Sequence, residues 1–138
     1  MKLHTLSALV TFAALTAEAQ TLPDYRCRID RVATSERTPN SQLDFMAKTY
    51  IGKEFTVDRR TGVMTGALRN SFITRPEVID RGSGDNSFKV VTTLRLDQGA
   101  GRGSNVYVLV VNEYRRTPEK PFLFLHNDEI YFGDCTHT

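Results

Sequence analysis

The sequence predicts a mainly β domain: an antiparallel meander of about seven strands that forms a small barrel or sandwich, with one short helix near residues 41–51. Short runs of alternating apolar and polar residues recur along the chain, separated by turn-forming residues. Only one segment carries apolar residues at helical spacing. Strands that follow one another closely pair antiparallel, and so many of them protect their edges by closing on themselves or by forming two packed sheets.

The first predicted strand covers residues 25–30, where apolar and charged side chains alternate and Cys27 points inward. Polar residues from 33 to 41 then predict a loop. We expect the helix from Ser41, as a candidate N-cap, to Ile51, because the apolar residues between them are three and four positions apart. Gly52 ends it.

The rest of the chain consists of short β-forming runs. Gly62 is expected in the left-handed conformation of a hairpin turn, and residues 127 and 128 are expected to form a second turn. The predicted strands in this part are residues 55–57, 63–65, 77–81, 88–96, 106–114, 122–126 and 129–132.

Residues 1–19 are predicted to be a secretory signal peptide, and residues 20–138 a single β-rich domain. A basic residue precedes an apolar run of about ten residues, which is half of what a membrane-spanning helix needs, and Ala17-Glu18-Ala19 forms a small-x-small cleavage site. We therefore expect an exported protein, periplasmic or extracellular, with no membrane span.

Export changes the interpretation of the two cysteines, Cys27 and Cys135. In an oxidising compartment they are expected to form one disulfide that joins the two ends of the domain. Closing a loop of about 100 residues stabilises a fold by at most about 4 to 5 kcal/mol in the chain-entropy model. A reactive or metal-binding pair is the alternative, but it favours closer spacing such as C-x-x-C.

Composition excludes several functions. The net charge is only +2 and the basic residues are interleaved with acidic ones, so the concentrated basic surface typical of nucleic-acid binding is missing. His126 is the one imidazole expected to be ordered, which rules out a histidine-rich metal site. The glycine-rich residues 99–103 precede a predicted strand rather than a helix, so they do not form a dinucleotide site. We predict no metal, no cofactor and no catalytic residues.

Arginines in predicted turns are the candidate binding residues, because a guanidinium group offers a planar pair of donors to a carboxylate or phosphate. Such arginines also occur in ordinary charged turns that keep a small β protein soluble. The candidates are Arg59, Arg60, Arg102, Arg115 and Arg116.

Four segments carry a family resemblance: residues 55–66, 79–83 and 86–91, and the closing Phe132-Gly133-Asp134-Cys135. They resemble small, uncharacterised exported proteins of proteobacteria, which implies export and this fold plan but no assigned activity. A second resemblance, over fewer residues, is to periplasmic lysozyme inhibitors of the small β-barrel type. It rests on the Tyr25-x-Cys27 start and the closing Cys135, with residues 82–86 in the position of the inhibitors' Ser-Gly-rich binding loop.

The sequence therefore favours a noncatalytic binding module for a protein, an envelope component or a small ligand. One alternative is a hydrolase that attacks an envelope polymer with two carboxylates, because paired acids can come from distant positions. The other is a structural protein that assembles through an open sheet edge.

Overall fold

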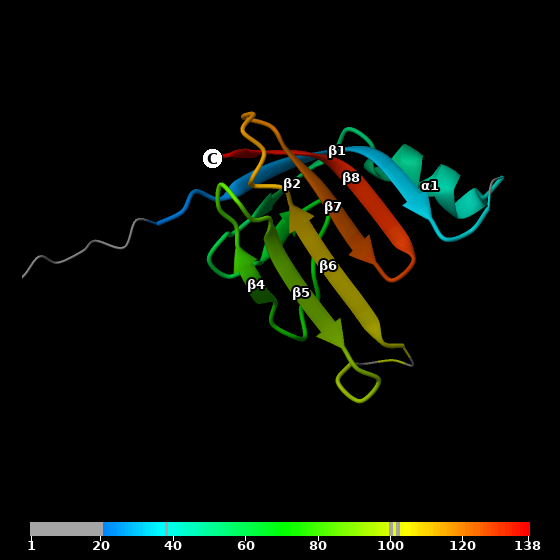
Figure 1. Cartoon of the computed structure of the whole chain (residues 1–138). Helices are drawn as coiled ribbons and strands as arrows, with labels where there is room; N and C mark the ends of the chain where they lie inside the picture. The colour runs from blue at the N-terminus through cyan, green and yellow to red at the C-terminus, as the bar shows by residue number, and fades with distance from the viewer. Residues whose placement is uncertain (1–20, 38, 100, 102) are drawn as a thin grey trace, which may run out of the picture.

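The computed structural model describes residues 21–138 apart from residues 38, 100 and 102 (Figure 1). The predicted signal peptide and the candidate Arg102 lie outside the described residues. Within this part of the chain, no helix is long and apolar enough to cross a membrane.

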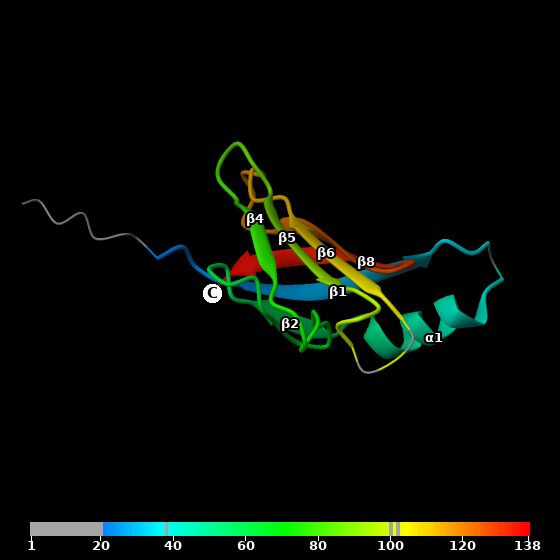
Figure 2. The same cartoon turned by 90° about the horizontal axis from the view of Figure 1, so that it is seen from below.

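One antiparallel sheet of eight strands and one helix make up the fold, which confirms the predicted class, and a strand forms at each of the eight predicted runs. The sheet is curled into a half-barrel (Figure 2). The elements are β1 (Tyr25–Thr34), α1 (Ser41–Tyr50), β2 (Glu54–Val57), β3 (Met64–Gly66), β4 (Glu77–Arg81), β5 (Phe88–Leu94), β6 (Asn105–Val111), β7 (Lys120–His126) and β8 (Glu129–His137).

The strand order is β3-β2-β1-β8-β7-β6-β5-β4. The first and last strands are therefore neighbours in the middle of the sheet, and the two edges are β3 and β4. All neighbouring strands pair antiparallel. The paired strands are also consecutive in sequence, except for β1 and β8, the first and last strands of the chain. The meander thus closes through β1 and β8 and is open between β3 and β4.

Cys27 and Cys135 are direct partners in the β1–β8 pair and form the predicted disulfide, 108 residues apart in sequence. Gly133 lies two residues away, opposite Ile29. A Cβ atom at this position would overlap the backbone oxygen of Arg28, so only glycine permits the two strands to approach this closely. The register of β1 shifts just after this point, between Ile29 and Arg31.

Strand β8 continues to His137, five residues beyond the predicted 129–132, because its second half pairs with the start of β1. The expectation that His126 is the one ordered imidazole is therefore wrong, because His137 lies in β8 as well. β1 also runs four residues past its predicted end at residue 30, into the predicted loop, because it remains paired with β8 there.

The two predicted turns are present. Gly62 has a φ of 78° between β2 and β3, and Asn127 has a φ of 55° between β7 and β8. Helix α1 begins at Ser41 as expected, but its N-cap is Asn40, whose side chain accepts hydrogen bonds from the backbone N–H groups of Gln42 and Leu43. The helix lies at the end of the sheet opposite the two described chain ends (Figures 1 and 2) and packs against β1.

The core fills the inner face of the half-barrel. Aromatic, aliphatic and sulfur-containing side chains from β1, β2, β5, β6, β7 and β8 meet there, joined by Met46 of α1. One polar side chain interrupts this apolar interior: Thr92 of β5 is 2% exposed, and among the described residues its Oγ1 has no hydrogen-bond partner.

We expect Thr92→Val to stabilise the fold by about 1 kcal/mol, because the substitution removes a buried hydroxyl that forms no hydrogen bond while preserving the shape of the side chain. Urea unfolding followed by circular dichroism measures the change. Thr93→Val, at the exposed neighbouring position on the same strand, is the control and should have little effect. A lower stability for Thr92→Val would show that the hydroxyl is hydrogen-bonded in solution.

Candidate functional site

The candidate site lies at the end of the half-barrel that holds the two described chain ends, and it is built around Arg59. This residue follows β2 in a tight turn, which Asp58 stabilises by accepting the backbone N–H groups of Arg60 and Thr61. The backbone N–H of Arg59 in turn donates to the carboxylate of Asp24, 2.8 Å away. Two carboxylates therefore hold the backbone of the turn.

The side chain of Arg59 is only 3% exposed and crosses the opening between the two sheet edges. Its Nε donates to the backbone oxygen of Arg81 at the end of β4, at 2.9 Å. Its Nη2 donates to the oxygen of Gly82, at 3.1 Å. Where β3 and β4 are not paired, this one guanidinium group connects the β2–β3 hairpin to the far side of the sheet.

A buried carboxylate balances the charge of Arg59. Glu113, just after β6, has an oxygen 3.7 Å from Nη1 of Arg59. The hydroxyl of Tyr25 donates to Glu113 at 2.7 Å, and Nε2 of His137 lies 3.0 Å from the other carboxylate oxygen. The Arg59 guanidinium also lies over the Tyr25 ring, 5.1 Å from its centre. Residues from four separate parts of the chain thus meet in one polar cluster.

The environment sets the charge states in this cluster. Burial by itself raises the pKa of Glu113, but the hydrogen bonds from Tyr25 and His137 and the charge of Arg59 outweigh it and lower the pKa below its ordinary value. Burial, together with the hydrogen bond to Glu113, raises the pKa of the Tyr25 hydroxyl far above its ordinary value. Tyr25 therefore remains a donor and Glu113 remains an anion.

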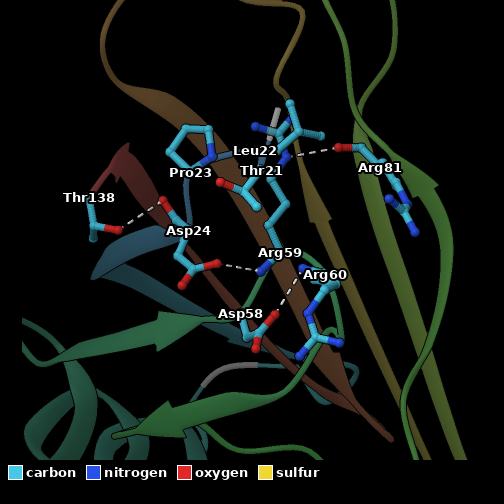
Figure 3. A pocket seen from close by; sticks show the side chains of 9 residues that line it. All are labelled: Thr21, Leu22, Pro23, Asp24, Asp58, Arg59, Arg60, Arg81 and Thr138. Carbon is cyan, nitrogen blue, oxygen red and sulfur yellow. Dashed lines mark hydrogen bonds between the residues drawn. The ribbon is translucent and has the colours of Figure 1, made fainter. Parts of the chain in front are cut away.

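Next to this cluster is a hollow of about 700 Å³ (Figure 3). Its volume falls within the range of small-molecule sites in proteins. The two ends of the described chain form one part of its wall, and the turn after β2 and the end of β4 form the rest. The lining residues are Thr21, Leu22, Pro23, Asp24, Asp58, Arg59, Arg60, Arg81 and Thr138.

Arg60 and Arg81 are the two exposed arginines that line the hollow. Within the described part of the chain, neither guanidinium group forms a hydrogen bond or a salt bridge. By contrast, the two lining carboxylates already accept backbone N–H groups, and a backbone hydrogen bond from Thr61 is the main reason that the pKa of Asp58 is lowered. The hollow therefore offers unused donors with positive charge.

The structure thus divides the sequence-predicted arginines. Arg60 lines the hollow with a side chain that has no partner among the described residues, whereas the Arg59 side chain that lines it is hydrogen-bonded to backbone oxygens. Arg115 and Arg116 are exposed in the connection between β6 and β7 and are not among the lining residues. Arg102 is outside the described residues.

Sequence reasoning missed Arg81, Glu113, Tyr25 and His137. In the sequence, Arg81 is the last residue of a predicted strand and Tyr25 is the first residue of another. Neither strand pattern indicates a polar partner for these side chains. The one available signal is Glu113, an acidic residue two positions after the apolar run of β6, where a buried arginine could find a counter-ion.

A second polar group lies at the opposite end of β8. The carboxylate of Glu129 accepts hydrogen bonds from Tyr131 at 2.8 Å and from Gln42 of α1 at 3.2 Å, and Nδ1 of His126 is 3.9 Å away. His126 and Glu129, on either side of the predicted turn at residues 127 and 128, are both partly buried. No group of three or more metal-ligating side chains is found among the described residues.

Comparisons with known proteins give no further lead: no protein-family model, no curated protein and no solved structure matches this chain.

We expect Glu113→Gln to destabilise the fold by about 3 kcal/mol, because Arg59 would lose the partner of its buried charge. Because the pKa of Glu113 is lower in the folded protein than its ordinary value of 4.5, its ionised form stabilises the fold above about pH 4.5. This contribution is lost as the pH falls through the folded-state pKa. Stability measured by urea unfolding should therefore decline less steeply with acid in Glu113→Gln than in the wild type.

The matched control is Glu119→Gln, an exposed glutamate in the same connection between β6 and β7. It should leave both the stability and its pH dependence almost unchanged. Equal behaviour of the two variants would contradict a buried ion pair at Glu113.

Proposed function

We propose that this protein is an exported, noncatalytic binding module, and that the hollow beside Arg59 recognises an anionic group, a carboxylate or a phosphate, on an envelope component or protein. One observation carries the proposal: Arg60 and Arg81 present two uncommitted guanidinium groups to the same hollow. A charged group with unused donors binds an oxyanion more strongly than a neutral donor does. Two such groups at one hollow favour a ligand with negative charge.

Arg59 has a supporting role in this proposal. Its side chain is held by Arg81, Gly82 and Glu113, so it fixes the turn that carries Arg60 and the strand end that carries Arg81. The two binding side chains are thereby placed on a connected, partly rigid frame. Binding to such a frame costs less conformational entropy than binding to a free loop.

Export is supported by the disulfide, since such bonds persist in oxidising compartments and are rare in the cytosol. The bond is buried within the sheet, with both cysteines 0% exposed, as expected for a structural disulfide. The residues that carry the predicted signal peptide are outside the described part of the chain, so the N-terminal sequence of the secreted protein is the direct test.

Two rival functions fit the site less well. A hydrolase that attacks an envelope polymer with two carboxylates needs both acids directed at the substrate, whereas the two acids that line this hollow, Asp24 and Asp58, already accept backbone N–H groups of the turn. Assembly through a sheet edge needs a long, regular free strand. The edge β3 has only three residues, and the register of the edge β4 is interrupted between Val78 and Asp80.

The double variant Arg60→Ala, Arg81→Ala should fold normally, because neither side chain forms a hydrogen bond or salt bridge within the described chain. It should bind inorganic phosphate and citrate at least about tenfold more weakly than the wild type, because two charge-assisted contacts are lost. Titrations followed by amide NMR shifts measure the affinity, and the wild-type shifts should concentrate at Thr21, Asp24 and residues 58–61.

The control is Arg115→Ala, Arg116→Ala, which removes the same charge from exposed positions outside the hollow. It should keep the wild-type affinity. Equal losses in the two double variants would show that only net charge matters, and shifts spread evenly over the surface would contradict a defined site.

A further inference from the structure

A second hollow, of about 300 Å³, lies at the end of the half-barrel opposite the hollow beside Arg59. Three strand residues on the inner face form one side of it: Leu94 at the end of β5, Tyr107 near the start of β6 and His126 at the end of β7. Residues 69–73, in the loop between β3 and β4, form the other side. We call it the ring hollow, because three of its lining side chains are rings.

Two of these rings are fixed by the sheet. Tyr107 and His126 are cross-strand partners, and their rings stack with centroids 4.5 Å apart and planes 9° apart. The Tyr107 ring also stacks on Phe124 of the core, with centroids 6.5 Å apart. The ring hollow therefore has a flat, preformed aromatic side, which favours contact with another flat group.

The third ring is Phe72, which the loop exposes to solvent. Phe72 is 84% exposed and its neighbour Ile73 is 57% exposed, although both line the ring hollow. Large apolar side chains that stay exposed next to a concave site are typical of a binding surface. A ligand in the ring hollow would cover apolar area that the folded chain leaves in water.

The loop that carries Phe72 is anchored at both ends of its exposed tip. The buried side chain of Asn70 accepts the backbone N–H of Met64 at 3.1 Å and donates to the backbone oxygen of Gly62 at 2.8 Å. Thr74 Oγ1 donates to the backbone oxygen of Thr93 in β5 at 2.7 Å. The exposed position of Phe72 is therefore a feature of a fixed loop, and ordering it around a ligand costs little conformational entropy.

Arg69 supplies positive charge at the ring hollow. Its Nε donates to the backbone oxygen of Gly66 at 3.2 Å, and its guanidinium carbon lies 5.6 Å from the centre of the Phe72 ring. Within the described part of the chain, its two Nη groups form no hydrogen bond or salt bridge. These donors are therefore available to an acidic group on a ligand whose ring lies near Phe72.

The charges around the ring hollow also give a ligand its orientation. Glu129 lies 3.9 Å from Nδ1 of His126, accepts hydrogen bonds from Tyr131 and Gln42, and is not a lining residue. Its carboxylate disfavours a second anion at the His126 end. An acidic group is therefore favoured at the Arg69 end, and the apolar part of the ligand is favoured toward the stacked rings.

We propose that the ring hollow binds a small aromatic carboxylate, with its ring among the aromatic side chains and its carboxylate at Arg69. The lining sets this class, since it combines flat apolar surface with one set of unused charged donors. Its volume is at the lower limit of small-molecule sites, about 300 Å³, which restricts the ligand to a single ring with a short side chain.

Three matched probes test the proposal: 3-phenylpropionate, 3-cyclohexylpropionate, which has the charge without the aromatic ring, and 3-phenylpropionamide, which has the ring without the charge. The wild type should bind 3-phenylpropionate at least about threefold more tightly than either of the others, because each lacks one of the two interactions. Amide NMR titrations measure the affinities, and the shifts should concentrate at residues 69–73, Leu94, Tyr107 and His126. Equal binding of the three probes, or no shifts at these residues, would overturn the proposal.

Substitution of Arg69 tests the role of its charge. Arg69→Gln should weaken 3-phenylpropionate binding to about the affinity of the amide, and it should leave binding of the amide unchanged. Arg75→Gln is the matched control, because Arg75 is an exposed arginine of the same loop that does not line the ring hollow. Equal losses in the two variants would show that only net charge matters and would contradict a carboxylate contact at Arg69.

Substitution of Phe72 tests the contact with the ring. Phe72→Ala should fold normally, because the side chain is exposed, and should weaken both aromatic probes at least about threefold. Phe45→Ala is its control, since Phe45 is 64% exposed on α1 and lies outside the ring hollow. Unchanged binding of both aromatic probes to Phe72→Ala would exclude this ring from the site.

The ring hollow and the anion site can be tested separately. Arg60→Ala, Arg81→Ala should bind 3-phenylpropionate at the ring hollow as the wild type does, because both arginines line the other hollow. Shifts of the wild type that are confined to the hollow beside Arg59, and lost in this double variant, would overturn the present proposal and leave the anion site standing.

Discussion

The pairing of β1 with β8 is the constraint on which the rest of the fold depends. It brings Cys27 and Cys135, which are 108 residues apart in sequence, together in the middle of the sheet. The disulfide joins the two strands there, and the glycine at position 133 permits their close approach. Because the meander is closed at this point, its break must fall elsewhere, between β3 and β4. The location of the hollow follows from the same arrangement, since the chain ends and the break lie at the same end of the half-barrel.

Arg59 satisfies backbone groups that are left without a strand partner where the sheet is open between β3 and β4. Two unpaired strand edges expose backbone donors and acceptors, and the guanidinium group of Arg59 satisfies two of the acceptors at the end of β4. A buried charge is costly unless it is paired, and Glu113 provides that pairing with help from Tyr25 and His137. Arg59, a candidate binding residue in the sequence, is thus also part of the framework, whereas the guanidinium group of its neighbour Arg60 has no hydrogen-bond or salt-bridge partner within the described chain.

The two faces of the single curled layer differ in what covers them. The inner face holds the core and ends in the polar cluster beside the hollow. The outer face of the central strands is apolar as well, so the sequence of these strands resembles that of strands buried on both sides.

The sequence by itself determined the local structure: the mainly β class, the helix from Ser41, the left-handed Gly62, the turn at residues 127 and 128, and the cysteine pair. These depend on period, turn residues and composition, which are properties of neighbours in the chain. Only the tertiary structure decided the strand order, the extension of β8 to His137 and the different roles of Arg59 and Arg60. The cluster of Tyr25, Arg59, Glu113 and His137 joins residues that are far apart in sequence, and a single sequence contains no periodic signal for such contacts. Whether an arginine in a turn faces solvent or a buried carboxylate depends on which strands meet around it.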